Sequence, residues 1–378
     1  MGLKQNTWKL NQWYAQDVAG NAEYSTTANN LFAMGNNSRG ELGQNNTTNY
    51  SSPAQIPGTT WSNLGTAGRG YHNSSAIKND GTLWVWGRNA EGGLAQNNDT
   101  QYSSPVQVPG TWSTVTNAYR TMYGIKTDGT LWSWGMNTNG RLGQNNNVDY
   151  SSPVQVGSGA DWSDVSAAAE GVHALKTDGT LWGWGNSGNG QIGNNNDVKM
   201  SSPVQIPGSW SDFAGGEQST YAIRTNGTLW SWGRNDRGDL GQNNRTERYS
   251  PVQVGTDATW SKIIGGVYNA FAIKTDGTLW SWGYNTYGQL AQNNTTYYSS
   301  PVQIPGTTWS YADGGHLITG GIKTDGTLWT WGGNEYGALG QNQYDVHRSS
   351  PVQVPGTWKT GKEGIYVGYD NITALVQL

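Results

Sequence analysis

The side chains best suited to chemistry are sparse in this chain and fall into no catalytic spacing. The four histidines are His72, His173, His316 and His347. None has a histidine four residues away, the spacing that places two zinc ligands on one helix face. No Gly-x-Ser-x-Gly turn presents a serine, no phosphate-binding loop ends in Lys-Ser or Lys-Thr, and no Asp-x-Asp-x-Asp series could hold calcium. The sequence therefore predicts no enzyme activity, no metal and no cofactor.

A unit of about 50 residues repeats along the chain and must supply the elements that position any site. Its core reads Thr-Asp-Gly-Thr-Leu-Trp-Ser-Trp-Gly, followed by Gly-x-Leu-Gly-Gln-Asn-Asn, Ser-Ser-Pro-Val-Gln-Val-Pro-Gly and Thr-Trp-Ser. The Gly that ends each Trp-x-Trp-Gly element is Gly87, Gly135, Gly185, Gly233, Gly283 or Gly332, and a degenerate copy ends at Gly35. The gaps between them are 52, 48, 50, 48, 50 and 49 residues. Seven copies at this period indicate a solenoid or a propeller.

Each unit predicts short strands joined by tight turns. An Asp-Gly or Asn-Gly pair separates two apolar runs, and a two-residue loop of this kind predicts a type I′ turn. In the strand after the turn, Trp132 and Trp134 should face one side and Ser133 the other. Pro-Val-Gln-Val predicts another strand, with Pro as its first residue. Thr-Trp-Ser-x-Val supplies the fourth strand, and no segment has helical periodicity.

Seven units of four short antiparallel strands predict an all-β fold, a seven-bladed β-propeller. A linear solenoid would need polar capping repeats at its ends. Here the ends of the chain instead look like two halves of one unit: residues 372–378 resemble the strand before the turn, and residues 30–35 resemble the strand after it. Their pairing would close the ring. Residues 29–378 thus form the propeller, while residues 1–28 are an N-terminal extension, either the edge of a decayed repeat or an anchoring arm.

Composition narrows the classes of partner. The chain has 55 Gly, 21 Trp, no Cys and only 13% charged residues, so large rings rather than many aliphatic side chains must fill the core. Disulfides and thiolate sites are excluded. The net charge is −4, which argues against nucleic acid because a phosphate-binding surface is normally basic. No run of about 18 apolar residues predicts a membrane span, and no apolar signal core begins the chain.

The Trp-Gly-x-Asn-x-x-Gly-x-Leu-Gly motif followed by Ser-Pro-Val resembles the regulator of chromosome condensation repeat family. Residues 135–143 and 233–241 match it, and the resemblance extends over residues 29–378. It implies a seven-bladed propeller. The founding eukaryotic member is an exchange factor for a small GTPase and binds chromatin, but this chain has no basic tail and no evident inserted wedge. The Gly-Trp-Arg-His-Thr motif of the plant ultraviolet-receptor relatives is also absent.

The most regular features of the repeat are better explained by structure than by binding. The paired Trp, such as Trp84 and Trp86, could stack on sugars or bases, but residues fixed in every unit are typical of packing. The recurring Asn and Gly fit turns better than a phosphate or calcium loop. The Lys before each turn, such as Lys126, could form a basic ring, although a packed stem with a solvated or Asp-paired head is the simpler interpretation.

Any asymmetric site should lie where the repeats differ most, between the Thr-Trp-Ser strand and the Ala-Ile-Lys strand. Repeat equivalence puts these seven segments on one face, as a crown. The candidate binding residues of the crown are Arg69, Tyr71, His72, Tyr119, Arg120, Glu170, His173, Glu217, Tyr268, His316, Tyr366 and Tyr369. Tyr and Arg are typical interface anchors, so Tyr119, Arg120 and Tyr268 are the best of these candidates. Neutral drift in loops is the alternative.

A second variable set precedes Ser-Ser-Pro and is rich in tyrosine, including Tyr50, Tyr102, Tyr150 and Tyr298. It is either a competing contact surface or loop filler.

The sequence therefore predicts a rigid, non-enzymatic binding or structural module. Its partner would be a protein or a surface glycan on one face of the propeller, with no nucleic acid and no membrane insertion. The nearly uniform repeats look like those of bacterial and phage-borne relatives. They favour an attachment or decoration component of a virion or cell surface over a nuclear protein. An exchange factor for a small GTPase and a lectin with seven similar shallow sites remain alternatives.

Overall fold

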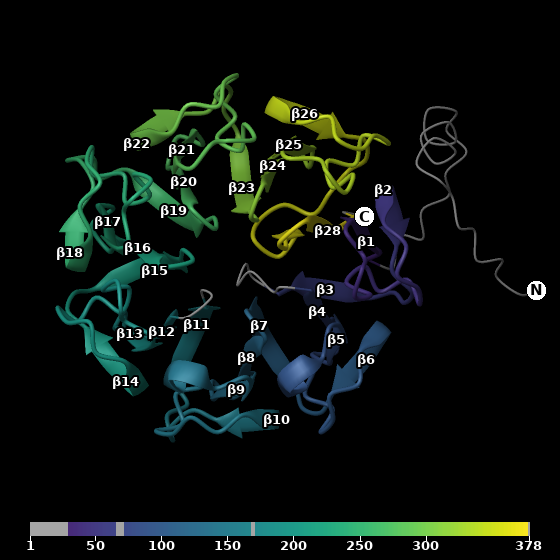
Figure 1. Ribbon diagram of the computed structural model, residues 1–378, viewed down its shortest axis with the longest axis horizontal. Helices are drawn as coiled ribbons and strands as arrows, with labels where there is room; N and C mark the ends of the chain where they lie inside the picture. The colour runs from purple at the N-terminus through teal and green to yellow at the C-terminus, as the bar shows by residue number, and fades with distance from the viewer. Residues whose placement is uncertain (1–28, 66–71, 168–170, 377–378) are drawn as a thin grey trace, which may run out of the picture.

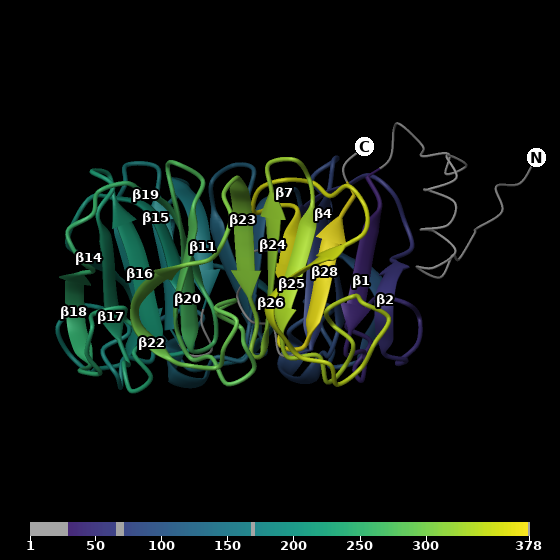
Figure 2. The ribbon, with the colours of Figure 1, turned by 90° about the horizontal axis from the view of Figure 1, so that it is seen from above.

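The computed structural model describes residues 29–65, 72–167 and 171–376, and these form a ring of seven four-stranded antiparallel sheets (Figure 1). Seen edge-on, the ring is a disc whose strands run between its two faces (Figure 2). The all-β, seven-bladed prediction is confirmed. The seven sheets are called blades 1 to 7, and each is named from the strand nearest the centre outwards.

The first four blades contain the following strands. Blade 1 is β3 (Trp61–Leu64), β4 (Asn73–Lys78), β5 (Leu83–Gly87) and β6 (Tyr102–Val108). Blade 2 is β7 (Trp112–Ala118), β8 (Thr121–Lys126), β9 (Leu131–Gly135) and β10 (Tyr150–Gln155). Blade 3 is β11 (Trp162–Ala167), β12 (Gly171–Lys176), β13 (Leu181–Gly185) and β14 (Met200–Ile206). Blade 4 is β15 (Trp210–Gly215), β16 (Ser219–Arg224), β17 (Leu229–Gly233) and β18 (Arg248–Gln253).

The last three blades include the closure of the ring. Blade 5 is β19 (Trp260–Gly265), β20 (Asn269–Lys274), β21 (Leu279–Gly283) and β22 (Tyr298–Gln303). Blade 6 is β23 (Trp309–Gly314), β24 (Ile318–Lys323), β25 (Leu328–Gly332) and β26 (Arg348–Val354). Blade 7 is β27 (Ile365–Val367), β28 (Asn371–Leu375), β1 (Leu31–Gly35) and β2 (Tyr50–Gln55). Two 3₁₀ turns, η1 (Ala90–Gly92) and η2 (Thr138–Gly140), lie between third and fourth strands.

Blade 7 confirms the predicted closure, because it contains strands from both ends of the chain. β1 pairs with β28 in antiparallel register from Leu31 opposite Leu375 to Gly35 opposite Asn371. β28 therefore lies between β27 and β1 and pairs with both. A ring closed this way leaves as sheet edges only the innermost strand and the outer strand of each blade. The role predicted for residues 1–28 lies outside the described residues.

The Thr-Trp-Ser strand belongs to a different blade than the repeat pattern suggested. The repeat pattern predicts it as the fourth strand of its unit, but it is the innermost strand of the following blade. For example, β6 is the outer strand of blade 1, and the next strand along the chain, β7, is the innermost strand of blade 2. Pro is also not the first residue of the outer strand. In β6, Pro105 lies inside the strand, where the register with β5 shifts between Val85 and Gly87. An outer edge strand with a bulge tolerates the missing N–H.

The Asp-Gly turn also differs from the predicted type I′ form. In blade 2 the Gly129 N–H donates to the Lys126 carbonyl and the Lys126 N–H donates to the Thr130 carbonyl. Gly129 has φ +81°, whereas Asp128 is not in the left-handed region. The loop is therefore three residues long, a type I turn followed by a left-handed glycine.

The Asp side chain explains why Thr and Trp follow this turn. Asp128 Oδ1 accepts from the Thr130 N–H at 3.0 Å and from its hydroxyl at 2.6 Å, and Thr130 Oγ1 in turn accepts from Trp132 Nε1 at 2.8 Å. The same chain of bonds recurs in blades 1, 3, 4, 5 and 6. The Thr-Asp-Gly-Thr-Leu-Trp motif is thus a hydrogen-bonded turn that orients one tryptophan.

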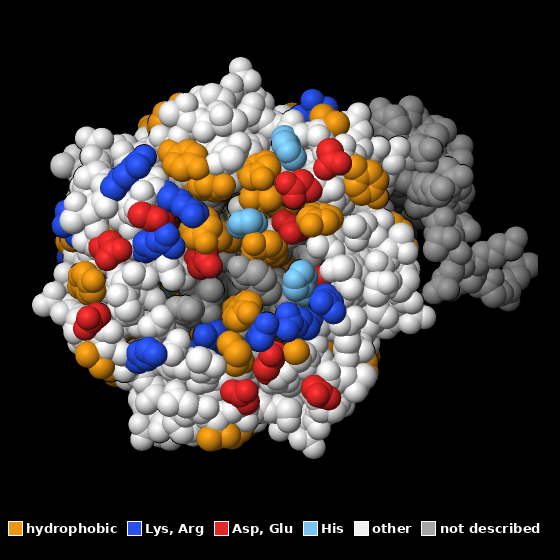
Figure 3. All heavy atoms as spheres, viewed as in Figure 1, with side chains coloured by type: hydrophobic (Ala, Val, Ile, Leu, Met, Phe, Trp, Pro, Cys, Tyr) orange, Lys and Arg blue, Asp and Glu red, His pale blue; other side chains and the backbone are white. Residues whose placement is uncertain are grey.

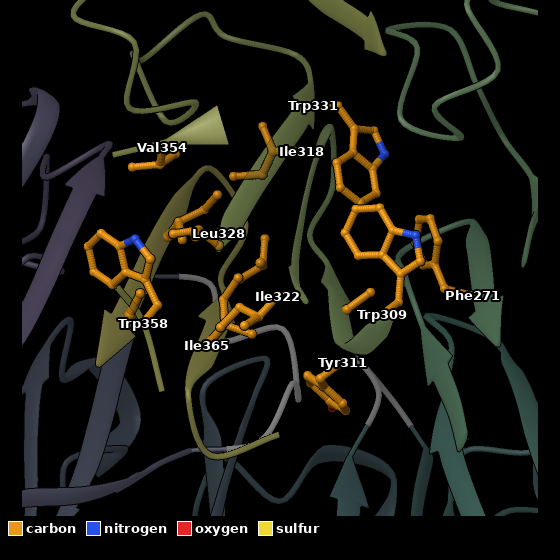
Figure 4. Packing of buried hydrophobic residues seen from close by; sticks show 14 of the residues in the cluster. Phe271, Trp309, Tyr311, Ile318, Ile322, Leu328, Trp331, Val354, Trp358 and Ile365 are labelled. Carbon is orange, nitrogen blue, oxygen red and sulfur yellow. The ribbon is translucent and has the colours of Figure 1, made fainter. Parts of the chain in front are cut away.

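The tryptophans form the core, as the packing interpretation predicted. Trp232 is fully buried, its ring centroid lies 5.8 Å from that of Trp210, and its Nε1 donates to the Gln191 carbonyl of blade 3 at 3.0 Å. In blade 6 Trp331 and Trp309 pack with Phe271 of blade 5 (Figure 4). The second Trp of each Trp-x-Trp pair therefore joins neighbouring blades by both apolar burial and a hydrogen bond.

The recurring cation before the turn lies over the rings of two tryptophans. Lys126 Nζ is 5.3 Å from the centroid of Trp112 and 3.7 Å from that of Trp132. Lys78, Lys176, Arg224, Lys274 and Lys323 repeat the arrangement. These cation–π contacts cover a face of each half-buried Trp ring. A ring of free lysines and a ring of open stacking platforms are therefore both absent from these six blades.

Blade 7 contains a short insertion that reaches across the central channel. In blade 6 a single residue, Ser310, separates Trp309 from the rest of the inner strand. At the equivalent place in blade 7, residues 359–363 separate Trp358 from Gly364. Lys362 Nζ reaches Asp164 of blade 3, on the far side of the channel, at 2.5 Å. The Gly361 N–H donates to Ser310 Oγ at 2.9 Å. The similar repeat lengths had not predicted this segment, because it lies after the last complete repeat.

Candidate functional site

The crown predicted from the sequence lies on the ring face that carries the loops between first and second strands. On this face the charged, histidine and hydrophobic side chains gather around the middle of the ring, and side chains of other types and backbone cover much of its periphery (Figure 3). Of the candidate residues, Arg69, Tyr71 and Glu170 lie outside the described residues. Seven others are half-buried on the crown face: His72, Tyr119, Arg120, Glu217, Tyr268, His316 and Tyr369.

Two candidates were wrongly placed on the surface. His173 is 1% exposed and packs edge-on against Trp232 of the next blade, with ring centroids 6.1 Å apart. Burial lowers the pKa of its imidazole to about 4, so the ring is neutral at pH 7. Tyr366 is 2% exposed, in β27. A signal for His173 was available: it lies three residues before the recurring Lys, where Tyr123 and Tyr221 also pack against the next Trp.

The candidates of blades 1 and 2 are already paired within the protein. His72 Nδ1 lies 2.6 Å from Oε1 of Glu41, which is buried. Arg120 donates to Glu91 at 2.7 Å and stacks over the Tyr119 ring at 4.8 Å. The ion pairs come from neighbouring blades, because Glu41 precedes β2 of blade 7 and Glu91 lies in η1 of blade 1. They tie adjacent crown loops together.

Blades 5 to 7 contribute a continuous row of rings, here called the aromatic strip: Tyr297, Tyr284, Tyr268, His316 and Tyr369. Tyr297 and Tyr284 have ring centroids 5.0 Å apart, and Tyr284 and Tyr268 are 6.0 Å apart. Tyr268 is 6.4 Å from His316, which stacks on Tyr369 at 4.3 Å with an interplanar angle of 15°. Four loops that are separate in sequence thus form one aromatic surface.

Blade 4 adds two arginines and a carboxylate to the strip at Tyr268. The Arg237 guanidinium lies 3.6 Å from the Tyr268 centroid and 4.9 Å from that of Tyr284. Arg234 lies 5.8 Å from the Tyr268 centroid. Burial and a hydrogen bond with Glu217 raise the pKa of the Tyr268 hydroxyl to about 12, so this group remains protonated and can donate at pH 7.

Sequence reasoning placed three members of the strip in the crown and assigned Tyr297 to the second variable set, before Ser-Ser-Pro, and it missed Tyr284 and the two arginines. Arg234 and Tyr284 occupy the first variable position of Trp-Gly-x-Asn, where other repeats have Arg88, Met136 or Gly333. The comparison of repeats that revealed the crown would have revealed this position too, had it been extended to the loop after the third strand.

Two carboxyl groups near the strip have strongly raised pKa values. Burial, with Asp236 nearby, raises the pKa of Asp239 to about 8. Its Oδ1 has no hydrogen-bond partner among the described residues. Burial, with Glu335 nearby, raises the pKa of Asp370 to about 7. At neutral pH Asp239 is therefore mainly protonated and does not neutralise the arginines above it.

Asp239→Asn should reduce the loss of stability at high pH. The native state keeps the Asp239 proton from about pH 4 to pH 8, where the unfolded chain has lost it, so the free energy of unfolding falls as the pH rises through this window. Urea unfolding would measure the free energy of unfolding at pH 5 and at pH 9. The decrease between these two pH values should be smaller in the variant than in the wild type by at least about 1 kcal/mol, because one pKa unit corresponds to about 1.4 kcal/mol.

The control for this measurement is Asp128→Asn. The exposed Asp128 has a lowered pKa because of its hydrogen bonds to Thr130, so it is ionised at both pH 5 and pH 9 in the native and unfolded states. This substitution should lower stability equally at the two values. An unchanged pH dependence in Asp239→Asn would show that this carboxyl does not hold a proton at neutral pH.

The competing tyrosine set is used inside its own loops. The hydroxyls of Tyr50, Tyr150 and Tyr298 accept from the side-chain amides of Asn46, Asn146 and Asn294 at 3.1 Å in each case, and Tyr102 accepts from Asn98 at 3.3 Å. All four rings are half-buried. Their recurrence is explained by loop structure, which leaves the aromatic strip as the richer contact surface.

No group of three His, Asp or Glu in the described ranges could hold a metal ion. Within the same ranges, no helix has the length and apolar character needed to cross a membrane.

Comparison with solved structures supports the architecture. Human WBSCR16 superposes with a TM-score of 0.81 at 18% identity over 93% of this chain and 99% of its own. Prp20p from Saccharomyces cerevisiae gives 0.80 at 15% identity over 96% of this chain and 95% of its own. At these identities the likeness shows the fold alone. No curated protein matches the sequence.

Family models give the classification. The RCC1-like domain matches residues 119–377, and the regulator of chromosome condensation (RCC1) repeat matches residues 80–116. The first of these matches alone covers more than half of the chain, over blades whose strands, turns and tryptophans repeat in the way described above. This chain belongs to the RCC1-like domain family.

Proposed function

We propose that this chain is a non-enzymatic protein-binding module and that its partner docks on the aromatic strip of the crown face. The observation that carries the proposal is the convergence of five rings from three blades with two arginines from a fourth. Tyr and Arg supply large, directional contact area and dominate binding energy at protein interfaces. The nearly uniform blades would serve as the rigid frame that holds these loops.

The other candidate surfaces offer less to a partner. The paired tryptophans are buried or covered by cations, and the tyrosines before Ser-Ser-Pro are tied to asparagines in their own loops. The face with the Asp-Gly turns presents almost the same residues in six blades. A partner that docks in one orientation needs an asymmetric surface, and the strip is asymmetric because the described residues of blades 1 to 3 form no equivalent row of rings.

Solved structures of the same fold include proteins described with protein partners. The Prp20p structure is described with its binding properties to Gsp1p and histones, and yeast RCC1 (Prp20) has been solved bound to Kap60. The second of these has a TM-score of 0.81 at 16% identity over 96% of this chain and 92% of its own. That likeness supports a protein partner for this chain, but it does not identify the partner.

An alanine scan against a purified partner tests the proposal. Proteins that co-purify from the native source would be identified and expressed, and the affinity of each would be measured for the full chain. Tyr268→Ala and Tyr369→Ala should each weaken binding by about 30-fold or more, the loss typical of interface anchors. Tyr150→Ala is the matched control and should leave affinity unchanged. Loss of binding only in Tyr150→Ala would move the site to the outer loops.

The more specific predictions made from the sequence are proposals of the same kind. An attachment or decoration role on a virion or cell surface would be tested by locating the protein in its source with a specific antibody. Exchange of nucleotide on a small GTPase would appear as faster release of a fluorescent nucleotide in a GTPase panel, and we expect none. A glycan array probed with the labelled chain would detect the lectin alternative.

A further inference from the structure

Arg237 differs from the other cations around the aromatic strip in how it is held. Its guanidinium lies over two tyrosine rings, Tyr268 at 3.6 Å and Tyr284 at 4.9 Å. The side chain is half-buried, so the rings restrict it without removing it from the surface. A guanidinium stacked on aromatic rings keeps its N–H donors in its own plane, where they can still bond.

Neighbouring arginines on the crown face are each paired with a carboxylate of this chain. Arg234 bonds Asp236 at 2.6 Å and Gln218 at 2.8 Å, and Arg120 bonds Glu91 at 2.7 Å. Arg237 takes part in none of the ion pairs or side-chain hydrogen bonds of the described residues. Its charge and donors remain available to another molecule.

The two carboxyl groups nearest in sequence, Asp236 and Asp239, do not cancel this charge. Asp239 is buried in the same loop with its pKa raised to about 8, so at neutral pH it is mainly uncharged. Asp236 is used by Arg234. A cation half-enclosed by rings, where water is partly excluded, attracts an anion more strongly than one in open solvent.

We propose that Arg237 is the anchor of the docking surface and receives an Asp or Glu side chain of the protein partner. This inference rests on the proposed function and adds the chemistry of the contact. The planar donor fork of arginine matches a carboxylate through two parallel hydrogen bonds. Tyr268 and Tyr284 fix the plane of the fork. The neighbouring rings of the strip would pack on the apolar residues around the partner's acid.

The test uses the full chain and a random dodecapeptide display library, because no partner need be known. Peptides selected on the wild-type chain should be enriched in Asp or Glu at one position. A fluorescent copy of a selected peptide, measured by anisotropy, should bind Arg237→Gln at least about 30-fold more weakly. Changing its acid to Asn or Gln should cost the same factor, and combining the two changes should cost little more.

Matched variants separate the possible outcomes. Arg245→Gln, which removes an exposed arginine from the outer loop of the same blade, should leave binding unchanged, and equal melting curves would show that both variants fold. Binding lost in Tyr369→Ala but retained in Arg237→Gln would overturn this inference and leave the proposed function standing. Peptides that bind independently of all crown variants, or no selected peptides, would overturn both. Competition by phosphate at lower concentration than by acetate would also overturn the carboxylate assignment.

Discussion

Deleting residues 372–378 should destabilise the protein by at least about 5 kcal/mol and lower its melting temperature by on the order of 10 °C. The deletion removes most of β28, the strand that pairs with both β27 and β1 and holds the two ends of the chain together. It also removes Ile372 and Leu375, both fully buried, and buried aliphatic side chains cost about 2–5 kcal/mol each when truncated. Thermal unfolding followed by circular dichroism would measure the effect.

Rescue in trans distinguishes ring closure from a general loss of core. A synthetic peptide of residues 371–378 should restore the melting temperature of the truncated chain in a concentration-dependent way, because it can add as a strand between β27 and β1. The same peptide with Ile372 and Leu375 changed to Asp should not. An unchanged melting curve after the deletion would contradict closure through the ends of the chain.

Trp232→Ala should destabilise by about 3–5 kcal/mol, the range of large aromatic truncations in cores. The indole is fully buried between Trp210 and His173 and donates to the Gln191 carbonyl, so the variant loses packing within blade 4 and across to blade 3. Denaturant unfolding gives the loss. Trp232→Phe retains much of the packing but lacks the N–H, and should lose about 1–2 kcal/mol.

The control for this prediction is Trp230→Ala, two residues away in the same strand. Trp230 is half-buried and lies against Trp210 and Arg224 within its own blade, so its truncation should cost less than that of Trp232. If Trp232→Ala kept its full stability and lost binding to a partner, the tryptophans would have to be a binding platform rather than the core.

Local patterns in the sequence were sufficient to predict the fold. The seven copies at similar spacings, the Asp-Gly turns and the half-units at the two ends each require only short-range geometry or simple counting, and each led to the ring of seven blades. The same reasoning was weaker on detail. It gave the turn two residues instead of three and made Pro105 the first residue of its strand, because hydrogen-bond register is decided by the partner strand.

The candidate site could be predicted only in part, for a similar reason. Comparing repeats located the crown and named Tyr268, His316 and Tyr369, because variable positions are visible in a single repetitive sequence. Whether a variable side chain points outwards depends on the strand register, which turned His173 towards Trp232 and buried it.

The sequence alone determined the number of repeated elements, the strands within each of them and the closure of the ring, since these follow from contacts between residues close along the chain or from repetition. Only the tertiary structure decided which loops meet. Tyr268, His316 and Tyr369 come from three blades, and the Lys362 side chain crosses the channel to Asp164, 198 residues away in sequence. Such contacts depend on how the ring curves and on side-chain rotamers in loops that no periodic pattern constrains, so they emerge only when the blades are assembled.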